Sequence, residues 1–149
     1  MIVRRERRVA AGPEEIWRVI SDPHRLPAWW PGVTRVEEVS PQAWTKVLQS
    51  PGGKAVRADF TRLEVEEPAH LSWRQELDES PFERLLNSSM TEINLEPAEG
   101  GETLVEIAVE HRPRGWARLS PFQMRAAATR QVEGALDGLA LLVGGEETS

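Results

Sequence analysis

The order of the predicted elements constrains the fold most: one strand, two short helices, six strands and one long helix. Between Gly32 and Arg114, clusters of Pro, Gly, Ser and Asp recur about once every dozen residues, a spacing typical of consecutive antiparallel strands. The six strands are predicted at 33–39, 43–49, 55–66, 70–77, 84–96 and 103–112. Residues 2–10 have β-forming ends and a charged middle, which predicts a further exposed or edge strand.

Helix-start signals occupy the segment that follows the first strand. Pro13 suits the first position of a helix, and the two acids after it favour the positive end of the helix dipole. Asp22 is predicted to cap a second helix that has Pro23 at its first position. Pro27 and Pro31 keep this second helix short. We therefore expect two short helices in tandem.

The C-terminal segment carries the clearest helix signal. Ser120 and Gln123 form a capping box around Pro121. Apolar residues and a threonine then recur at three- and four-residue steps, which predicts a long amphipathic helix that ends at Gly144–Gly145. The residues of this stripe are Phe122, Ala126, Thr129, Val132, Leu136, Leu139 and Val143.

Composition excludes several classes of protein. The 149 residues are 40% hydrophobic and 28% charged, which indicates a single globular domain spanning 1–149. The chain has no Cys, and its three histidines lack metal-ligand spacing, so we expect neither a metal site nor a cofactor. The net charge of −6 argues against nucleic-acid binding. Only Lys46 and Lys54 are lysines among 18 basic residues, a bias that suggests a GC-rich bacterial genome.

No segment resembles a secretion signal or a transmembrane helix. The basic N-terminus lacks an apolar core, and the longest apolar stretch, 136–143, falls short of the ~20 residues that span a bilayer. We therefore predict a cytoplasmic protein that is not integral to a membrane. The sequence leaves the oligomeric state open.

A single long helix must cover one face of a seven-stranded sheet, and a curved sheet around a helix tends to leave space between the two. Several motifs in this order resemble the START-like, SRPBCC or helix-grip superfamily, which includes polyketide cyclase/dehydrase-like proteins. The resemblance covers nearly the whole chain. It rests on residues 10–17 (AAGPEEIW), 21–23 (SDP), 26–33 (LPAWWPGV), 65–68 (VEEP), 71–73 (LSW), 95–97 (LEP) and 100–101 (GG).

The resemblance implies an α+β helix-grip fold, in which a curved seven-stranded antiparallel sheet wraps around the long C-terminal helix. It also implies a hydrophobic cavity between the sheet and that helix. Such a cavity holds a lipid, a polyketide or another apolar small molecule. Some members of the superfamily are aromatase/cyclases, and many are carriers or receptors.

Strand alternation selects the polar residues that would line this cavity. In the strand 84–96, Asn87, Ser89 and Thr91 share the predicted inward face with three apolar residues. In the strand 103–112, Val109 and His111 share the inward face. His111 and Asn87 are therefore candidate polar groups of the pocket. The alternative for His111 is a hydrogen bond at the strand end near the rim.

The strand 55–66 has two possible phases. If Leu63 and Val65 face inward, strict alternation also brings Arg57 and Asp59 inward, where an arginine can bind a ligand oxygen. The residues before Phe60 favour the opposite phase, and a β-bulge near Phe60 would reconcile the two halves. The sequence does not decide between them.

Tryptophans supply the remaining candidates. Six Trp are present without any Tyr, and Trp17 is expected in the core. Trp29 and Trp30 are adjacent, so we expect one to pack and the other to face the mouth of the cavity. The predicted ligand-binding side chains outside the two strands above are Trp30, Trp44, Trp73, Trp116 and, from the helix, Thr129.

Three functions follow from these residues. The first is binding of an apolar small molecule, without catalysis or with weak catalysis. The second is a polyketide cyclase-like enzyme, with His111, Arg57 and Asp59 as acid–base or orienting groups. The third is a protein-interaction module whose cavity is filled. Convergent polar residues would favour the enzyme, an apolar cavity the carrier, and an exposed apolar patch the interaction module.

Overall fold

The computed structural model describes residues 1–50, 52–83, 85–114 and 120–144. Its strands are β1 (Ile2–Val9), β2 (Val33–Glu37), β3 (Ala43–Gln49), β4 (Ala55–Glu66), β5 (His70–Glu76), β6 (Leu86–Pro97) and β7 (Thr103–Pro113). Its helices are α1 (Pro13–Ile20), α2 (Leu26–Trp29) and α3 (Pro121–Gly144), with 3-10 turns η1 (Pro23–Arg25) and η2 (Glu99–Gly101). The predicted order and type of the elements are confirmed.

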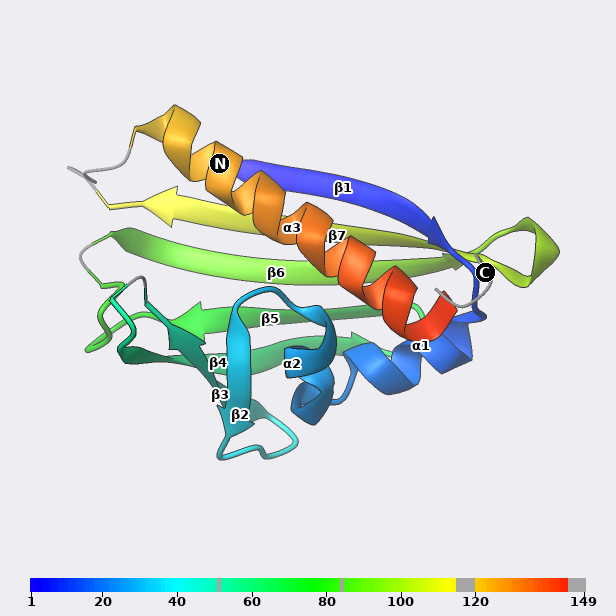
Figure 1. The fold of residues 1–149 in the computed structure, drawn as a ribbon, viewed down its shortest axis with the longest axis horizontal. Coiled ribbons are helices and arrows are strands. Elements are labelled where there is room, and N and C mark those ends of the chain that lie inside the picture. The colour runs from blue at the N-terminus through cyan, green and yellow to red at the C-terminus, as the bar shows by residue number, and fades with distance from the viewer. Residues whose placement is uncertain (51, 84, 115–119, 145–149) are drawn as a thin grey trace.

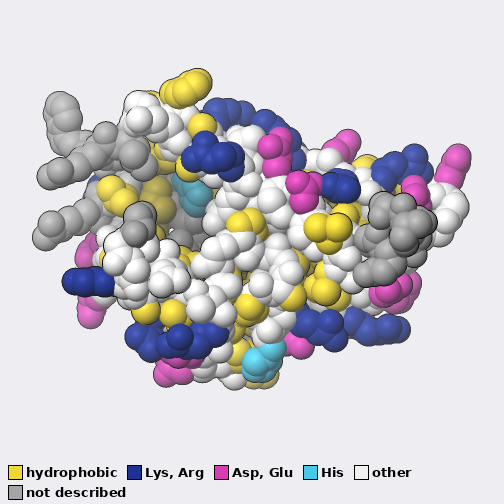
Figure 2. Space-filling view, in the orientation of Figure 1, with side chains coloured by type: hydrophobic (Ala, Val, Ile, Leu, Met, Phe, Trp, Pro, Cys, Tyr) yellow, Lys and Arg dark blue, Asp and Glu magenta, His cyan; other side chains and the backbone are white. Residues whose placement is uncertain are grey.

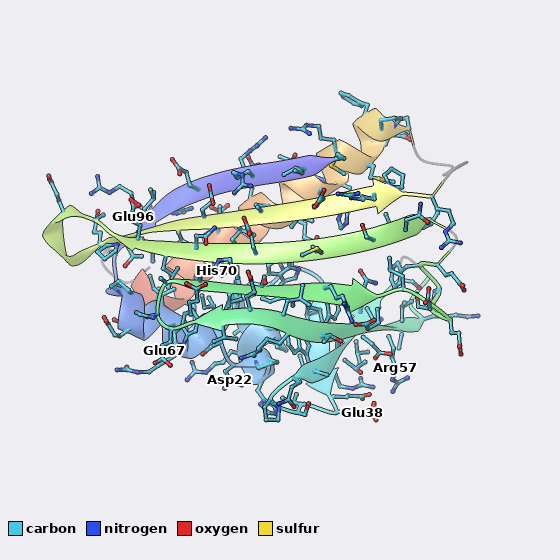
Figure 3. All side chains as sticks on the ribbon, turned by 180° about the vertical axis from the view of Figure 1, so that it is seen from behind. Asp22, Glu38, Arg57, Glu67, His70 and Glu96 are labelled. Carbon is cyan, nitrogen blue, oxygen red and sulfur yellow. The ribbon has the colours of Figure 1, made fainter. Side chains whose placement is uncertain are left out.

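The seven strands form one antiparallel sheet in the order β1-β7-β6-β5-β4-β3-β2. α3 crosses one face of this curved sheet diagonally, and α1 and α2 lie on the same side (Figure 1). The opposite face of the sheet is free of helices (Figure 3). The sheet therefore has an inner face, which packs against the helices, and an outer face. This is the predicted helix-grip arrangement.

Local signals in the sequence account for the helix starts. The Asp22 carboxylate accepts a hydrogen bond from the His24 backbone N–H at 3.0 Å, so it caps η1 as predicted. At α3, the Gln123 N–H donates to Ser120 Oγ at 3.1 Å, and the Ser120 N–H donates to Gln123 Oε1 at 3.2 Å. These reciprocal bonds are the predicted capping box.

The buried face of α3 differs from the predicted stripe in its first half. Phe122 is 82% exposed, whereas Met124 and Ala128 are buried. From Val132 onward the predicted and observed faces agree. The three- and four-residue spacing used for the prediction therefore chose the wrong face for the first turns of the helix.

Close contacts also position α2. A Cβ atom at Gly138 of α3 would collide with the carbonyl oxygen of Trp29, and one at Gly134 would lie 2.9 Å from Pro31 Cγ. These glycines let the end of α2 lie against α3. Trp30 follows α2 with extended dihedral angles, so the chain turns and both tryptophans point into the core. The expected difference in burial between the two is therefore wrong, although Trp30 does line the space between the sheet and α3.

β4 adopts the second of its two predicted phases. Ala58 and Phe60 are buried on the inner face, whereas Arg57 and Asp59 are exposed on the outer face. The register shifts between Arg62 and Glu64, slightly later than the predicted bulge. Leu63 and Val65 nevertheless remain exposed, and they were therefore wrongly expected to be inside.

Candidate functional site

A pocket of about 210 Å³ lies on the inner face of the sheet, beneath α3. β3, β4, β5, β6 and β7 supply most of its wall, and Trp30, directly after α2, and Gln131 of α3 line it from the other side. Its described lining residues are Trp30, Lys46, Leu48, Ala58, Phe60, Gln75, Phe82, Leu86, Ser89, Thr91, Val109, His111 and Gln131. The wall is thus mainly apolar, with two titratable side chains, Lys46 and His111.

A second pocket of about 240 Å³ adjoins the first near the start of β6 and the N-terminal half of α3. The two pockets share Leu86, His111 and Gln131. Hydrophobic and histidine side chains reach the surface beside the start of α3 (Figure 2). The second pocket therefore forms an approach to the first, and His111 lies where the two meet.

Register explains how the strands bring these residues together. On β3, strand alternation places Trp44, Lys46 and Leu48 on the inner face. Lys46 pairs with Ala58 of β4, whose small side chain leaves space beside the lysine. On the other side of the pocket, Thr91 pairs with Val109 and Ser89 pairs with His111.

Lys46 is the most unusual residue of this site, because it is a lysine that is only 4% exposed. Its Nζ lies 4.3 Å from the ring centroid of Phe60, 4.5 Å from that of Trp30 and 5.5 Å from that of Trp73. No described side chain forms an ion pair or a hydrogen bond with it. Burial lowers the pKa of Lys46 to about 7.

Three of these rings belong to a cluster of aromatic residues. Trp30 and Trp73 meet edge to face with centroids 5.8 Å apart, and Trp44 stacks on Phe60 at 6.1 Å. Trp44 and Trp73 are also edge to face, at 5.6 Å. Such pairs hold the ring faces in fixed positions. The aromatic wall around Lys46 is therefore preorganised.

His111 is the second titratable group. Burial, with a smaller contribution from the positive charge of the Met1 amino group, lowers the pKa of its imidazole. Its Nδ1 is buried without a hydrogen-bond partner among the described residues. A neutral imidazole with a free ring nitrogen can donate or accept one hydrogen bond, depending on its tautomer.

The structure places the predicted ligand-binding residues in different environments. Five of them line the pocket: Trp30, Ser89, Thr91, Val109 and His111. Trp44 and Trp73 are buried in the aromatic cluster directly behind that lining. Thr129 lies on another face of α3, beside Phe122 and Arg130. Trp116 lies outside the described residues.

Asn87 is exposed, contrary to the inward orientation predicted for it. The cause is a shift in register between Leu86 and Ser88, where β6 pairs with β7. This irregularity changes the phase of the strand, so Leu86 lines the pocket in place of Asn87. A bulge in this position left no signal in the sequence.

The two charged candidates of β4 point away from the pocket. Arg57 lies on the outer side of the sheet (Figure 3), where its Nη2 is 3.0 Å from a Glu37 carboxylate oxygen. Asp59 accepts a hydrogen bond from Thr45 Oγ1 at 2.6 Å on the same side. Neither residue lines the pocket, so the inward orientation on which their predicted acid–base role depended is wrong.

Sequence reasoning missed Lys46, although the sequence held a signal for it. Trp44 was predicted to face the interior, and alternation then places Lys46 on the same face. No group of three or more His, Asp or Glu that could hold a metal ion occurs in the described part of the chain. None of its helices is long and apolar enough to cross a membrane.

Comparison with solved structures identifies the fold. A START superfamily protein from Mycobacterium smegmatis superposes with a TM-score of 0.79 at 14% identity, over 99% of both chains. XoxI from Bacillus cereus gives a TM-score of 0.77 at 15% identity, over 98% of this chain and 97% of its own. The di-domain aromatase/cyclase StfQ of the steffimycin biosynthetic pathway gives 0.74 at 16% identity, over all of this chain and 53% of its own.

Comparison of the sequence alone gives the family. No curated protein matches the chain. A family profile described as "polyketide cyclase / dehydrase and lipid transport" matches residues 1–144. The profile covers every element of the sheet and α3. The chain therefore belongs to the polyketide cyclase/dehydrase and lipid transport family, with the fold of START superfamily proteins.

Proposed function

We propose that this protein binds an apolar small molecule in the pocket between the sheet and α3. The observation that carries the proposal is the pocket itself, which opens through the approach at His111 and has a wall of aromatic and aliphatic side chains. Taken with this approach, its size is near the lower end of the ~300–1,000 Å³ usual for ligand sites. The family description, which includes lipid transport, supports the same function.

Native mass spectrometry of freshly purified protein tests this proposal, because a ligand that fills the pocket should copurify and add its mass. Titration with apolar ligands should also quench tryptophan emission at micromolar concentrations, since Trp30 lines the pocket and Trp73 lies behind it. Absence of both effects would contradict the proposal.

A pair of variants tests whether the ligand binds in this pocket. Ala58→Leu adds three carbon atoms beside Lys46 and should weaken binding at least ~10-fold, because the added volume displaces the ligand. Ala55→Leu, on an exposed position of the same strand, is the matched control and should leave the affinity unchanged. Equal affinity of the two variants would place the ligand elsewhere.

A cyclase-like enzyme is the second candidate, favoured by the presence of Lys46 and His111 in one pocket. Each has a pKa lowered by burial, so each has a neutral form available to accept a proton near pH 7. An enzyme of this kind would fold a poly-ketone chain against the aromatic wall and move protons. Turnover of a poly-ketone substrate should then be lost in both His111→Ala and Lys46→Met; unchanged turnover in either would exclude this role for that residue.

A further inference from the structure

We propose that the ligand of this pocket carries one negatively charged oxygen group, a carboxylate or a phenolate, on its apolar body, and that Lys46 is the counter-ion of that group. This inference rests on the proposed binding function and specifies its ligand class. It starts from a buried cation without an anion.

The surroundings of Lys46 satisfy its ammonium group only in part. The rings of Phe60, Trp30 and Trp73 attract a cation through their faces, but a ring face is a poor substitute for the three acceptors that an ammonium group can engage. A buried charge is normally paired with an opposite charge and hydrogen-bonded. The described side chains supply neither, so the remaining acceptors of Lys46 come from whatever fills the pocket that it lines.

Arg62 shows how the same face of the sheet treats another partly buried cation. Its Nη2 donates to the Ser21 carbonyl oxygen at 2.9 Å, and the charge of Asp22 acts on it favourably. It also lies against the Trp44 ring, 5.5 Å from the centroid. Arg62 thus has both a ring and a protein acceptor. Among the described side chains Lys46 has the rings alone, and it is the one of the two that lines the pocket.

The polarity of the pocket selects an anion over a cation or a second amine. The described lining contains no carboxylate, although the chain has 24 Asp and Glu against 18 Lys and Arg. The other uncharged polar groups of the lining are the hydroxyls of Ser89 and Thr91 and the amides of Gln75 and Gln131, all of which can donate hydrogen bonds. These donors and the ammonium group together suit an oxygen anion.

The apolar walls define the rest of the ligand. Trp30, Phe60 and Leu48 surround the lysine, whereas Phe82, Leu86 and Val109 line the pocket around them. Leu86 also lines the approach. The acidic group would therefore enter first and the apolar body would extend back toward the approach.

Proton linkage gives this inference a distinctive signature. Among the described side chains that line the pocket, the only titratable groups are Lys46 and His111. An anion beside Lys46 raises its pKa, so the complex takes up a proton when it forms above pH 7. Affinity should then fall by about tenfold for each pH unit above 7, because only the protonated lysine attracts the anion.

The experiment compares decanoate and 2-naphthoate with their neutral amides, decanamide and 2-naphthamide, by titration calorimetry or tryptophan quenching at pH 7 and pH 9. These pairs match in shape and differ in charge. At pH 7 we expect at least one anion to bind about tenfold or more tightly than its amide. At pH 9 that advantage should largely disappear, whereas the affinity of the amides should not change.

Two lysine variants test whether Lys46 causes the preference for the anion. Methionine is similar in length to lysine and packs well against aromatic rings. Lys46→Met should therefore lose the preference for the anion but still bind the amides. Lys54→Met is the matched control, since Lys54 is exposed, and should keep the preference. If Lys46→Met does not fold, the pH dependence of the wild-type protein decides the matter.

The outcomes separate this inference from the proposed function. Equal binding of anions and amides, a preference that survives in Lys46→Met, or an affinity independent of pH would overturn the role of Lys46 while leaving a binding pocket. If neither anions nor amides bind below 1 mM, this inference and the proposed function both fail. A preference that depends on His111→Gln and not on Lys46→Met would assign the anion to the histidine and overturn the inference.

Discussion

The outer face of the sheet and the pocket treat their positive charges in opposite ways. On the outer face, arginines pair with carboxylates, as in Arg4 with Glu106 at 3.0 Å and Arg57 with Glu37 at 3.0 Å. On the inner face, Lys46 is held among rings and lacks a carboxylate partner among the described residues. Exposed ion pairs contribute little to stability, whereas a buried unpaired charge is costly. The outer pairs therefore serve solubility and surface packing, and the inner lysine indicates a function.

The largest effect that tests this contrast is on stability. Lys46→Met removes a buried amine that folding must desolvate, so the ligand-free protein should become more stable by roughly 1–4 kcal/mol. Lys54→Met should change the free energy of unfolding by less than about 0.5 kcal/mol. Urea denaturation at pH 7 measures both. A destabilised Lys46→Met would show that the lysine supports the fold.

The pH dependence of stability in the same variants tests whether burial of Lys46 lowers its pKa. Between pH 7 and 10.5 the unfolded chain holds the Lys46 proton and the folded chain does not, so the free energy of unfolding should rise with pH in this window. The chain has no Cys and no Tyr, which leaves few other groups that titrate there. Lys46→Met should lack most of this rise.

A substitution at the interior helix contact should have the next largest effect. Gly138→Ala places a methyl group against the Trp29 carbonyl and should cost about 1–3 kcal/mol, because α2 and α3 must separate. Gly52→Ala has open space around the added carbon and serves as the control. Thermal unfolding of both variants measures the difference. Equal stability would mean that α2 moves freely against α3.

The aromatic cage should have a smaller effect, seen on the lysine itself. Phe60→Leu removes the ring whose centroid lies 4.3 Å from Lys46 Nζ. The pKa of Lys46 should therefore fall further, by about 0.5–1. The exposed Lys54 provides the internal reference in an NMR titration. A pKa of Lys46 that rises in this variant would mean that water entering the pocket outweighs the lost ring.

Substitutions on the outer face of the sheet should have the smallest effect on stability and binding. Arg57→Ala and Asp59→Asn remove charges that lie away from the pocket, so each should change stability by less than about 1 kcal/mol. Neither should alter ligand affinity, as fluorescence titration can show. Loss of binding in either variant would mean that β4 takes the opposite phase in solution.

Turn chemistry and periodicity sufficed to predict the fold. Pro, Gly, Ser and Asp at regular intervals separated the strands, and the capping box at Ser120 marked the start of α3. Both signals act through the local backbone, so they can be read from one sequence. The family resemblance then indicated how the sheet and helix pack.

The site was harder to predict, because it depends on strand phase. Bulges near Leu86 and Arg62 change the phase within a strand and are set by pairing with a neighbour. Asn87 was misplaced for that reason, whereas the shift at Arg62 pairs Val65 with the buried Leu71 and Val65 is exposed nonetheless. Lys46 was overlooked for a different reason. Alternation from Trp44 places it on the inner face, but lysines are usually exposed, so a lysine on an apolar face was not expected.

The most direct test of the account is the pKa of Lys46 in ligand-free protein, measured by NMR on lysine-labelled protein. Only two lysines are present, so two Cε signals are expected, and Lys54→Arg assigns them. We predict that Lys46 titrates near pH 7 and that decanoate or 2-naphthoate raises its pKa. A Lys46 signal that titrates near pH 10.5 and is unaffected by either anion would contradict the claim that the pocket holds a buried amine that binds an anion.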